Sequence, residues 1–217
     1  PHMDGNEVAK RLNLKVEWVC QKFNAMIPAL LADKVDLIIA SVGITEERKQ
    51  RIDFSAPYRI TVAQFIGPKS KPLPLFNADG TTNTSAFQGL RVGLQRGTTY
   101  DNWIQAKTPN ATVVRYDSVE QLYLDLKSGR VDVIFTNPMK AYIEFLSKSD
   151  GAGYEVVGPQ LNDSKYFGDG AGIAMRKGNN ALRERINGAL RDMNKDGSME
   201  RFSKTYFPFA IYPKLPG

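Results

Sequence analysis

The sequence predicts an α/β fold of two similar lobes, because one pattern of elements occurs twice along the chain. Residues 25–41 align without a gap with residues 121–137, and each copy reads as a helix, a basic residue, Val-Asp and a short apolar strand. Both strands are apolar on both faces, which is typical of parallel strands covered by helices on either side. The 217 residues are enough for two such cores.

In the second copy, we expect a strand over 91–94, a helix, a strand over 112–115, a helix between Ser118 and Gly129, and a strand over 133–136. Ser118 and Gln121 form a capping-box pattern, and Gly129 is a typical helix stop. In the first copy, we expect helices over 6–12 and 24–34 and strands over 14–19 and 37–40. Each copy then contains a right-handed βαβ unit. The first copy has no counterpart of strand 91–94.

The remaining segments predict further strands and two helices. Strands are expected over 60–66, 155–157 and 173–176, and residues 67–85 have the composition of a loop. One helix has Leu182, Ile186, Leu190 and Met193 on one face and ends at Gly197, and a second covers 199–206. The glycine run 168–172 precedes a strand instead of following one, so it predicts a turn and not a dinucleotide site.

Composition excludes several functional classes. The formal charge of +6 is spread along the chain without a basic cluster, which argues against a nucleic-acid interface, and no apolar run is long enough to cross a membrane. The Pro1-His2-Met3 leader resembles the remnant of an expression tag, so we take the native part to begin near Asp4. That part has no histidine and one cysteine, Cys20, for which we expect an inert, half-buried thiol. We therefore expect no catalytic residues, metal or cofactor.

Ligands of parallel α/β sheets bind beyond the carboxyl ends of the strands. These ends carry small polar residues: Ser41 in the first copy, and Thr98 and Thr99 in the second. Their hydroxyls suit a carboxylate or an amine, and helix capping is the plain alternative. Arg48 could bind a carboxylate through two N–H groups, or it could be an exposed surface residue without a ligand. Phe23 could pack its ring against a ligand, or it could belong to the apolar core.

Five segments closely resemble bacterial periplasmic amino-acid-binding proteins of ABC importers. They are residues 35–41, 44–58, 165–172, 194–198 and 206–207. The resemblance is strongest to the branch that binds lysine, arginine and ornithine, histidine, or opines, and it covers essentially the whole chain from Asp4.

The resemblance implies a two-lobed, hinged Venus-flytrap fold, in which each lobe is a central sheet flanked by helices. Lobe 1 is then 4–60 plus 170–217, and lobe 2 is 63–167. The hinge residues implied are Ile60, Thr61, Val62, Gly168, Asp169 and Gly170.

The resemblance also implies a ligand site between the lobes. The aromatic ring of Phe23 packs on the ligand side chain, Ser41 and the Gly43 backbone bind its amino and carboxylate groups, and Arg48 clamps the carboxylate. Thr98 and Thr99 meet that carboxylate from lobe 2. The full set of ligand-binding residues is Phe23, Ala40, Ser41, Gly43, Arg48, Gln95, Thr98, Thr99 and Asn137.

Three departures from the family pattern bear on binding. The acidic residue that the family uses for the ligand ammonium is replaced by Asn137, which removes a charge-assisted hydrogen bond and suits an opine with a substituted amine. Gly43 stands where serine is common. The first strand of lobe 1 and its ligand-binding loop are missing, so we expect either a homodimer through the unpaired sheet edge or impaired ligand affinity.

The function implied is capture of a polar or basic amino acid, or an opine, in the periplasm and its delivery to the membrane subunits of an ABC permease. No signal peptide is present in the sequence, and no nucleic-acid partner or membrane insertion is expected. One alternative is a truncated, oligomerising relative that serves as an interaction or sensor module. Another is an enzyme resembling cyclohexadienyl dehydratase, although Asn137 supplies neither an acid nor a base.

Overall fold

The computed structural model describes residues 2–21, 23–40, 42–208, 211–213 and 215, and the chain in it divides into two compact units. Unit 1 comprises Pro1–Thr61 and Gly168–Gly217, and unit 2 comprises Val62–Phe167. The side chains of His2, Met3, Phe23, Asn24 and Tyr206 lie outside the description. In the part of the chain described, no helix combines the length and the apolar character needed to cross a membrane.

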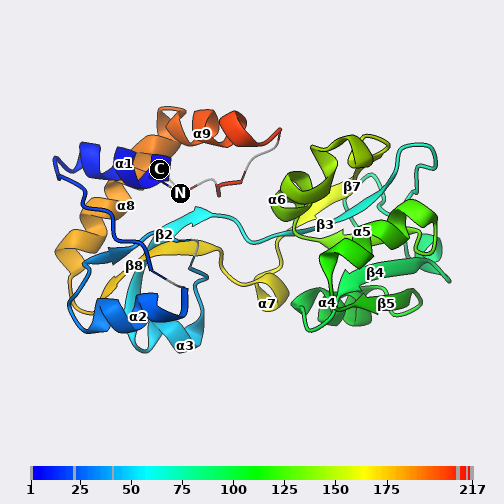
Figure 1. Cartoon of the computed structure of the whole chain (residues 1–217), viewed down its shortest axis with the longest axis horizontal. Coiled ribbons are helices and arrows are strands. Elements are labelled where there is room, and N and C mark those ends of the chain that lie inside the picture. The colour runs from blue at the N-terminus through cyan, green and yellow to red at the C-terminus, as the bar shows by residue number, and fades with distance from the viewer. Residues whose placement is uncertain (1, 22, 41, 209–210, 214, 216–217) are drawn as a thin grey trace. The chain divides into compact units, whose positions relative to one another are not determined.

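Unit 2 is built on a five-stranded sheet with the order β5-β4-β6-β3-β7 (Figure 1). β4 is parallel to β5 and β6, whereas β3 is antiparallel to β6 and β7. Its elements are β3 (Ala63–Pro68), η1 (Thr84–Phe87), β4 (Arg91–Gln95), α4 (Thr99–Lys107), β5 (Thr112–Tyr116), α5 (Val119–Ser128), β6 (Val133–Thr136), α6 (Pro138–Ala141), η2 (Tyr142–Leu146), η3 (Ser149–Gly151), β7 (Tyr154–Leu161) and α7 (Ser164–Phe167).

The core of unit 2 lies on both faces of this sheet. Val133 and Phe135 of β6 pack into one cluster with Trp103 of α4, and Ile134 packs into a second cluster with Leu122 of α5. β6 is thus buried on both faces, which confirms the prediction from its continuous apolar run.

Local signals set the ends of α5 as predicted. The Ser118 hydroxyl accepts a hydrogen bond from the Gln121 backbone N–H at 3.2 Å, and Gly129 ends the helix with a φ of 78°. Glycine adopts this left-handed conformation without the steric penalty of other residues.

Unit 1 contains a three-stranded sheet with the order β1-β8-β2, and both pairs in it are antiparallel. Its elements are α1 (His2–Arg11), α2 (Phe23–Leu31), β1 (Leu37–Ile38), α3 (Glu46–Lys49), β2 (Ile52–Arg59), β8 (Ala171–Arg176), α8 (Asn180–Lys195) and α9 (Ser198–Tyr206). The predicted helices near the C-terminus are confirmed as α8 and α9.

β8 separates two apolar clusters in unit 1. Ile173 and Met175 pack with residues of α1, α8 and α9, and Ala174 packs on the other face with Leu30 of α2. Figure 1 shows α1 and α9 on one side of this sheet and α2 and α3 on the other. Ion pairs fix α1 in place: the buried carboxylate of Asp4 pairs with Arg59 of β2, and Arg11 pairs with Asp196.

The predicted strand at residues 14–19 is wrong. This segment forms no strand, β1 has only two residues, and β1 pairs antiparallel with β8, so the first copy makes no βαβ unit. Unit 2 offers a comparison, because β5 and β6 do not pair with each other there and both bond to β4, which lies between them. In unit 1, none of the described residues forms a strand beside the free edge of β1, and segment 14–19 pairs with no described strand. Cys20, which follows it, is exposed and not half-buried as predicted.

The strand predicted over 60–66 is displaced. Residues 60–62 lie outside any strand, and the preceding residues form β2, which the sequence analysis missed because Pro57 and the polar residues around it resemble a loop. Register irregularities on both sides of Pro57 explain how a proline fits there. Strands 155–157 and 173–176 are confirmed, each with extra residues, as β7 and β8.

Two glycines with similar backbones allow a test of packing at the start of β8. Gly170 has a φ of 87°, and a Cβ atom there would lie 2.5 Å from the Arg59 carbonyl oxygen. Gly178 has a φ of 91° with open space around it. We expect Gly178→Ala to cost about 1–2 kcal/mol through backbone strain, and Gly170→Ala to cost roughly 3 kcal/mol or more because the backbone must also move. Urea unfolding measures both, and equal losses would contradict the packing at Gly170.

Candidate functional site

The ligand-binding residues expected from the sequence fall into two groups, one in each unit. Ala40, Gly43 and Arg48 belong to unit 1, and Gln95, Thr98, Thr99 and Asn137 belong to unit 2. Ser41 lies outside the described residues, and Phe23 begins α2 with its side chain outside the description. Each group has an internal geometry that the sequence did not specify.

Backbone bonds to the start of β8 fix the segment around Gly43. Gly43 forms an isolated antiparallel bridge with Ala171. The Ile44 N–H donates to the Gly170 carbonyl at 2.9 Å, and the Gly172 N–H donates to the Val42 carbonyl at 3.2 Å. The backbone of residues 42–44 is therefore held on both sides of the bridge, which is a rigid position for groups that bind a ligand.

Arg48 is oriented by the same segment. It lies on α3. The Thr45 hydroxyl caps this helix by accepting a hydrogen bond from the Arg48 backbone N–H at 3.2 Å. The guanidinium Nη1 donates to the Gly43 carbonyl at 2.8 Å, and the side chain is half-buried. A Cβ atom at position 43 would lie 3.3 Å from Nη1, so glycine leaves room for the guanidinium. A guanidinium fixed in this way presents a planar fork that suits a carboxylate.

The unit 2 group is built around the turn from β4 to α4. Gly97 has a φ of 76°, and Thr98 precedes the helix in an extended conformation. The Thr98 hydroxyl donates to the Gln95 carbonyl at 2.7 Å and makes no capping bond, so the capping alternative for Thr98 is wrong. Thr99 is exposed at the first position of α4. Helix N–H groups that no side chain caps attract an anion such as a carboxylate.

Asn137 stands at the end of β6 and begins α6. Its Oδ1 atom accepts hydrogen bonds from the backbone N–H groups of Met139 at 2.8 Å and Lys140 at 3.4 Å. The side chain is half-buried, and its remaining polar group is the Nδ2 donor. Asn137 thus combines a structural role in α6 with a neutral donor at the strand end.

Tyr100 joins the two parts of the unit 2 group, and the sequence analysis did not identify it. A backbone hydrogen bond from Asn137 reaches the Tyr100 hydroxyl, and burial raises the pKa of Tyr100 above its ordinary value. The ring packs against Phe135 and Phe167 at centroid distances of 5.8 and 6.0 Å. The contact holds the first turn of α4 beside the end of β6. Its only sequence signal is an aromatic residue directly after Thr98 and Thr99.

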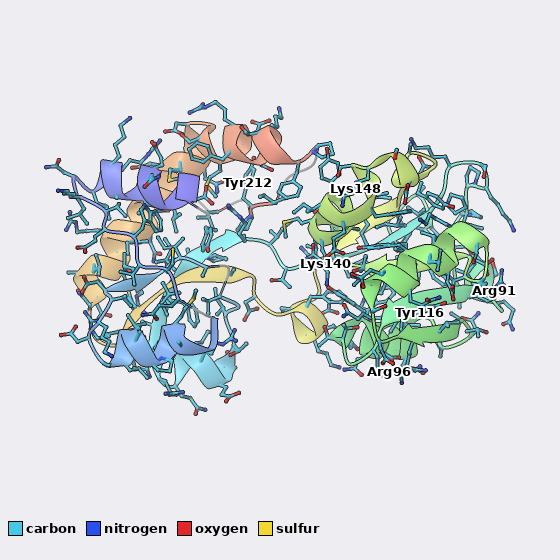
Figure 2. The ribbon with its side chains drawn as sticks, viewed as in Figure 1. Arg91, Arg96, Tyr116, Lys140, Lys148 and Tyr212 are labelled. Carbon is cyan, nitrogen blue, oxygen red and sulfur yellow. The ribbon has the colours of Figure 1, made fainter. Side chains whose placement is uncertain are left out.

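Two cations adjoin the unit 2 group, and Figure 2 labels both. Arg96 follows Gln95 and pairs with Asp117 at 2.8 Å, and Lys140 lies exposed in the first turn of α6. Together with the start of α4, these positive groups suit the carboxylate end of a ligand better than a cationic side chain. Among the described residues, no three His, Cys, Asp or Glu side chains gather as a metal site.

Comparison with known proteins identifies relatives along nearly the whole chain. Residues 5–209 match the family of bacterial extracellular solute-binding proteins, family 3. The L-arginine-binding protein of Pseudomonas aeruginosa is 37% identical over 210 residues, which cover 96% of this chain and 78% of that protein. The lysine/arginine/ornithine-binding periplasmic protein of Escherichia coli is 33% identical over 210 residues, with coverage of 96% and 78%.

A solved structure shows the fold of such proteins. The L-cystine solute receptor of Neisseria gonorrhoeae, in its unliganded open conformation, aligns with a TM-score of 0.79 at 21% identity and covers 96% of this chain and 83% of that one. At this identity the likeness concerns the fold, and it confirms the predicted two-lobed α/β class.

Proposed function

We propose that this chain, which belongs to the bacterial extracellular solute-binding proteins of family 3, captures a basic or polar amino acid and delivers it to an ABC permease in the membrane. The ligand is arginine, lysine, ornithine, histidine or an opine built on one of them, and the location is the periplasm. The observation that carries the proposal is the 37% identity to an arginine-binding protein over 96% of this chain. Binding, and not catalysis, is the activity.

In unit 1, Arg48 binds the α-carboxylate of the ligand. Support comes from the bond to the Gly43 carbonyl, which fixes the guanidinium before a ligand arrives. Ser41 and the backbone of Gly43 bind the α-amino and carboxylate groups, Ala40 lines the same strand end, and the ring of Phe23 packs on the ligand side chain.

In unit 2, Thr98 and Thr99 bind the carboxylate through the start of α4, and Gln95 lies at the end of the preceding strand. The absence of a capping bond from Thr98 supports this role, because the first N–H groups of the helix keep their capacity to bind an anion. Asn137 faces the ligand amine as a neutral group, which gives no charge-assisted bond and no acid or base for a dehydratase reaction.

Closure between the units requires a hinge at the two chain crossings. The hinge residues are Ile60, Thr61 and Val62 on one crossing and Gly168, Asp169 and Gly170 on the other. Gly168 and Gly170 have φ angles of 79° and 87°, which glycine adopts freely. Ligand contacts on both units favour the closed state by their differential affinity.

Ligand titration tests the proposed function directly. We expect the melting temperature to rise saturably with arginine, lysine, ornithine, histidine, octopine or nopaline, because binding to the native state alone stabilises it. Glutamate serves as the control ligand of opposite charge. A protein that melts cooperatively and responds to none of these ligands would overturn the proposal.

The role of Arg48 is tested by a charge-conserving substitution. Arg48→Lys keeps the positive charge but loses the planar fork, and a lost hydrogen bond to a charged group is worth about 1.5–3 kcal/mol, which is roughly a 10- to 100-fold loss of affinity. Arg51→Lys is the matched control, because Arg51 is exposed just beyond α3. Isothermal titration calorimetry with the ligand identified above measures both. Equal affinities of the two variants would exclude Arg48 from the carboxylate site.

The substitution Asn137→Asp is expected to change the affinity for amino acids more than the affinity for opines. Aspartate caps α6 as well as asparagine does, so the fold is kept. A free α-ammonium gains a charge-assisted bond, and we expect affinity for arginine to rise roughly 10- to 100-fold. Octopine and nopaline, whose amine is substituted, gain less. Calorimetry with both ligand classes gives the ratio of the affinity for arginine to the affinity for opines. If this ratio is the same in the wild type and in Asn137→Asp, Asn137 lies away from the ligand amine.

A further inference from the structure

Tyr100 occupies the second position of α4, directly after the two threonines of the unit 2 group. Its hydroxyl accepts a hydrogen bond from the backbone N–H of Asn137, which follows the last residue of β6. The ladder between β3 and β6 ends one residue earlier, where Thr136 lies opposite Gln64. Beyond the end of the ladder, the Tyr100 side chain therefore supplies the partner that a half-buried backbone N–H requires.

The aromatic core of unit 2 fixes the position of the Tyr100 ring. The ring packs edge-on against Phe135 at a centroid distance of 5.8 Å, and its centroid lies 6.0 Å from that of Phe167. Phe135 is fully buried and stacks on Phe65 at a centroid distance of 4.3 Å. Because a close-packed interior allows few positions for a ring, the core determines where the Tyr100 hydroxyl lies.

Three hydrogen bonds fix the geometry of Asn137. The Tyr100 hydroxyl binds its backbone N–H, and its Oδ1 atom accepts from the backbone N–H groups of Met139 at 2.8 Å and Lys140 at 3.4 Å. The backbone bond sets where the residue stands relative to α4, and the two side-chain bonds set the direction of its amide. The direction of the Nδ2 donor therefore depends on all three bonds.

Two neighbouring side chains attach the first turn of α4 to the sheet. Tyr100 bonds to the residue after β6, and Asp101 accepts a hydrogen bond from the guanidinium of Arg115 on β5 at 2.9 Å. The Thr98 hydroxyl stays within the preceding turn, where it donates to a backbone carbonyl. Tyr100 therefore relates the start of α4 to Asn137, and Asp101 keeps α4 on the sheet independently of that bond.

We propose that Tyr100 is a positioning residue of the amino-acid site: its hydroxyl couples the start of α4, which takes the ligand carboxylate, to Asn137, which faces the ligand amine. This inference rests on the proposed function, from which the two ligand groups are taken. Both groups belong to the α-carbon of one amino acid, so their separation is short and fixed. A protein site that holds its two binding groups at a matching separation loses less freedom when the ligand binds.

Tyr123 offers a matched control in the same unit. Its hydroxyl donates to the Glu144 carboxylate at 2.7 Å, and its ring stacks on Phe145 at a centroid distance of 4.9 Å. It belongs to the apolar cluster around Leu122 of α5, whereas Tyr100 packs against the other cluster of the unit. Substitution by phenylalanine removes one hydroxyl and keeps the ring in both cases, but the lost partner belongs to the ligand site only at Tyr100.

The test compares Tyr100→Phe with Tyr123→Phe in the full chain, using the ligand that binds most tightly in the titration described above. We expect Tyr100→Phe to weaken binding roughly 3- to 10-fold in calorimetry, which is the range that one neutral hydrogen bond accounts for. Tyr123→Phe is expected to lower the urea midpoint of unfolding and to leave the affinity unchanged. Faster hydrogen exchange of the Asn137 amide in Tyr100→Phe reports the lost bond directly.

A double substitution separates positioning from a general structural role. Asn137→Asp is expected to tighten arginine binding through a charge-assisted bond, and such a bond depends on geometry. We expect this gain in affinity to be at least about threefold smaller when Tyr100→Phe is also present, and to be unchanged beside Tyr123→Phe. If Tyr100 were merely structural, its substitution would lower the stability of both backgrounds equally and leave the gain intact.

Failure of the positioning role and failure of the proposed function give different results. Equal affinities of the wild type and Tyr100→Phe, or an equal gain from Asn137→Asp with and without Tyr100→Phe, would overturn the positioning role alone. A wild type that melts cooperatively and binds none of the ligands would overturn the proposed function and the role of Tyr100 with it. The wild type supplies a further check without any substitution: saturating ligand is expected to slow exchange of the Asn137 amide, and an unchanged rate would contradict the coupling.

Discussion

Both units are organised by the requirement that backbone groups of a buried strand find hydrogen-bond partners on two edges. Unit 2 meets it with β4, which bonds to β5 and β6 and allows three parallel strands to form from local βαβ segments. Unit 1 meets it with β8, which comes from the far end of the chain and bonds to β1 and β2. The sheet of unit 1 therefore depends on a contact between segments that are distant in the sequence.

The candidate site in unit 1 depends on the same contact between distant segments. The bridge between Gly43 and Ala171 attaches the segment that orients Arg48 to the first residue of β8. Gly170, directly before that residue, accepts the hydrogen bond from Ile44. One short stretch of chain thus completes the sheet, positions the guanidinium and leads into the crossing to unit 2. The geometry of Arg48 and the start of β8 are parts of one hydrogen-bonded structure.

Local signals in the sequence were enough for the helices and for the strands of the second copy. The Ser118 cap, Gly129 and the apolar face of α8 each act within a few residues, so the sequence predicted α5 and α8 correctly. Segment 14–19 failed because alternation shows which face of a strand is apolar and not whether a neighbour exists. Residue types at the strand ends were predictable, but the Tyr100 contact to Asn137 was not, because only the folded chain brings α4 and β6 together.

Residues that align between the two units are covered to different degrees. Residues that flank β4 in unit 2 are buried, whereas the described residues that align with them in unit 1 are half-buried or, at Cys20, exposed. None of the described strands pairs with the edge of β1 opposite to β8, whereas Gly43 and Arg48 are attached on the β8 side. The orientation of Arg48 therefore depends on the start of β8 and not on the other edge of β1.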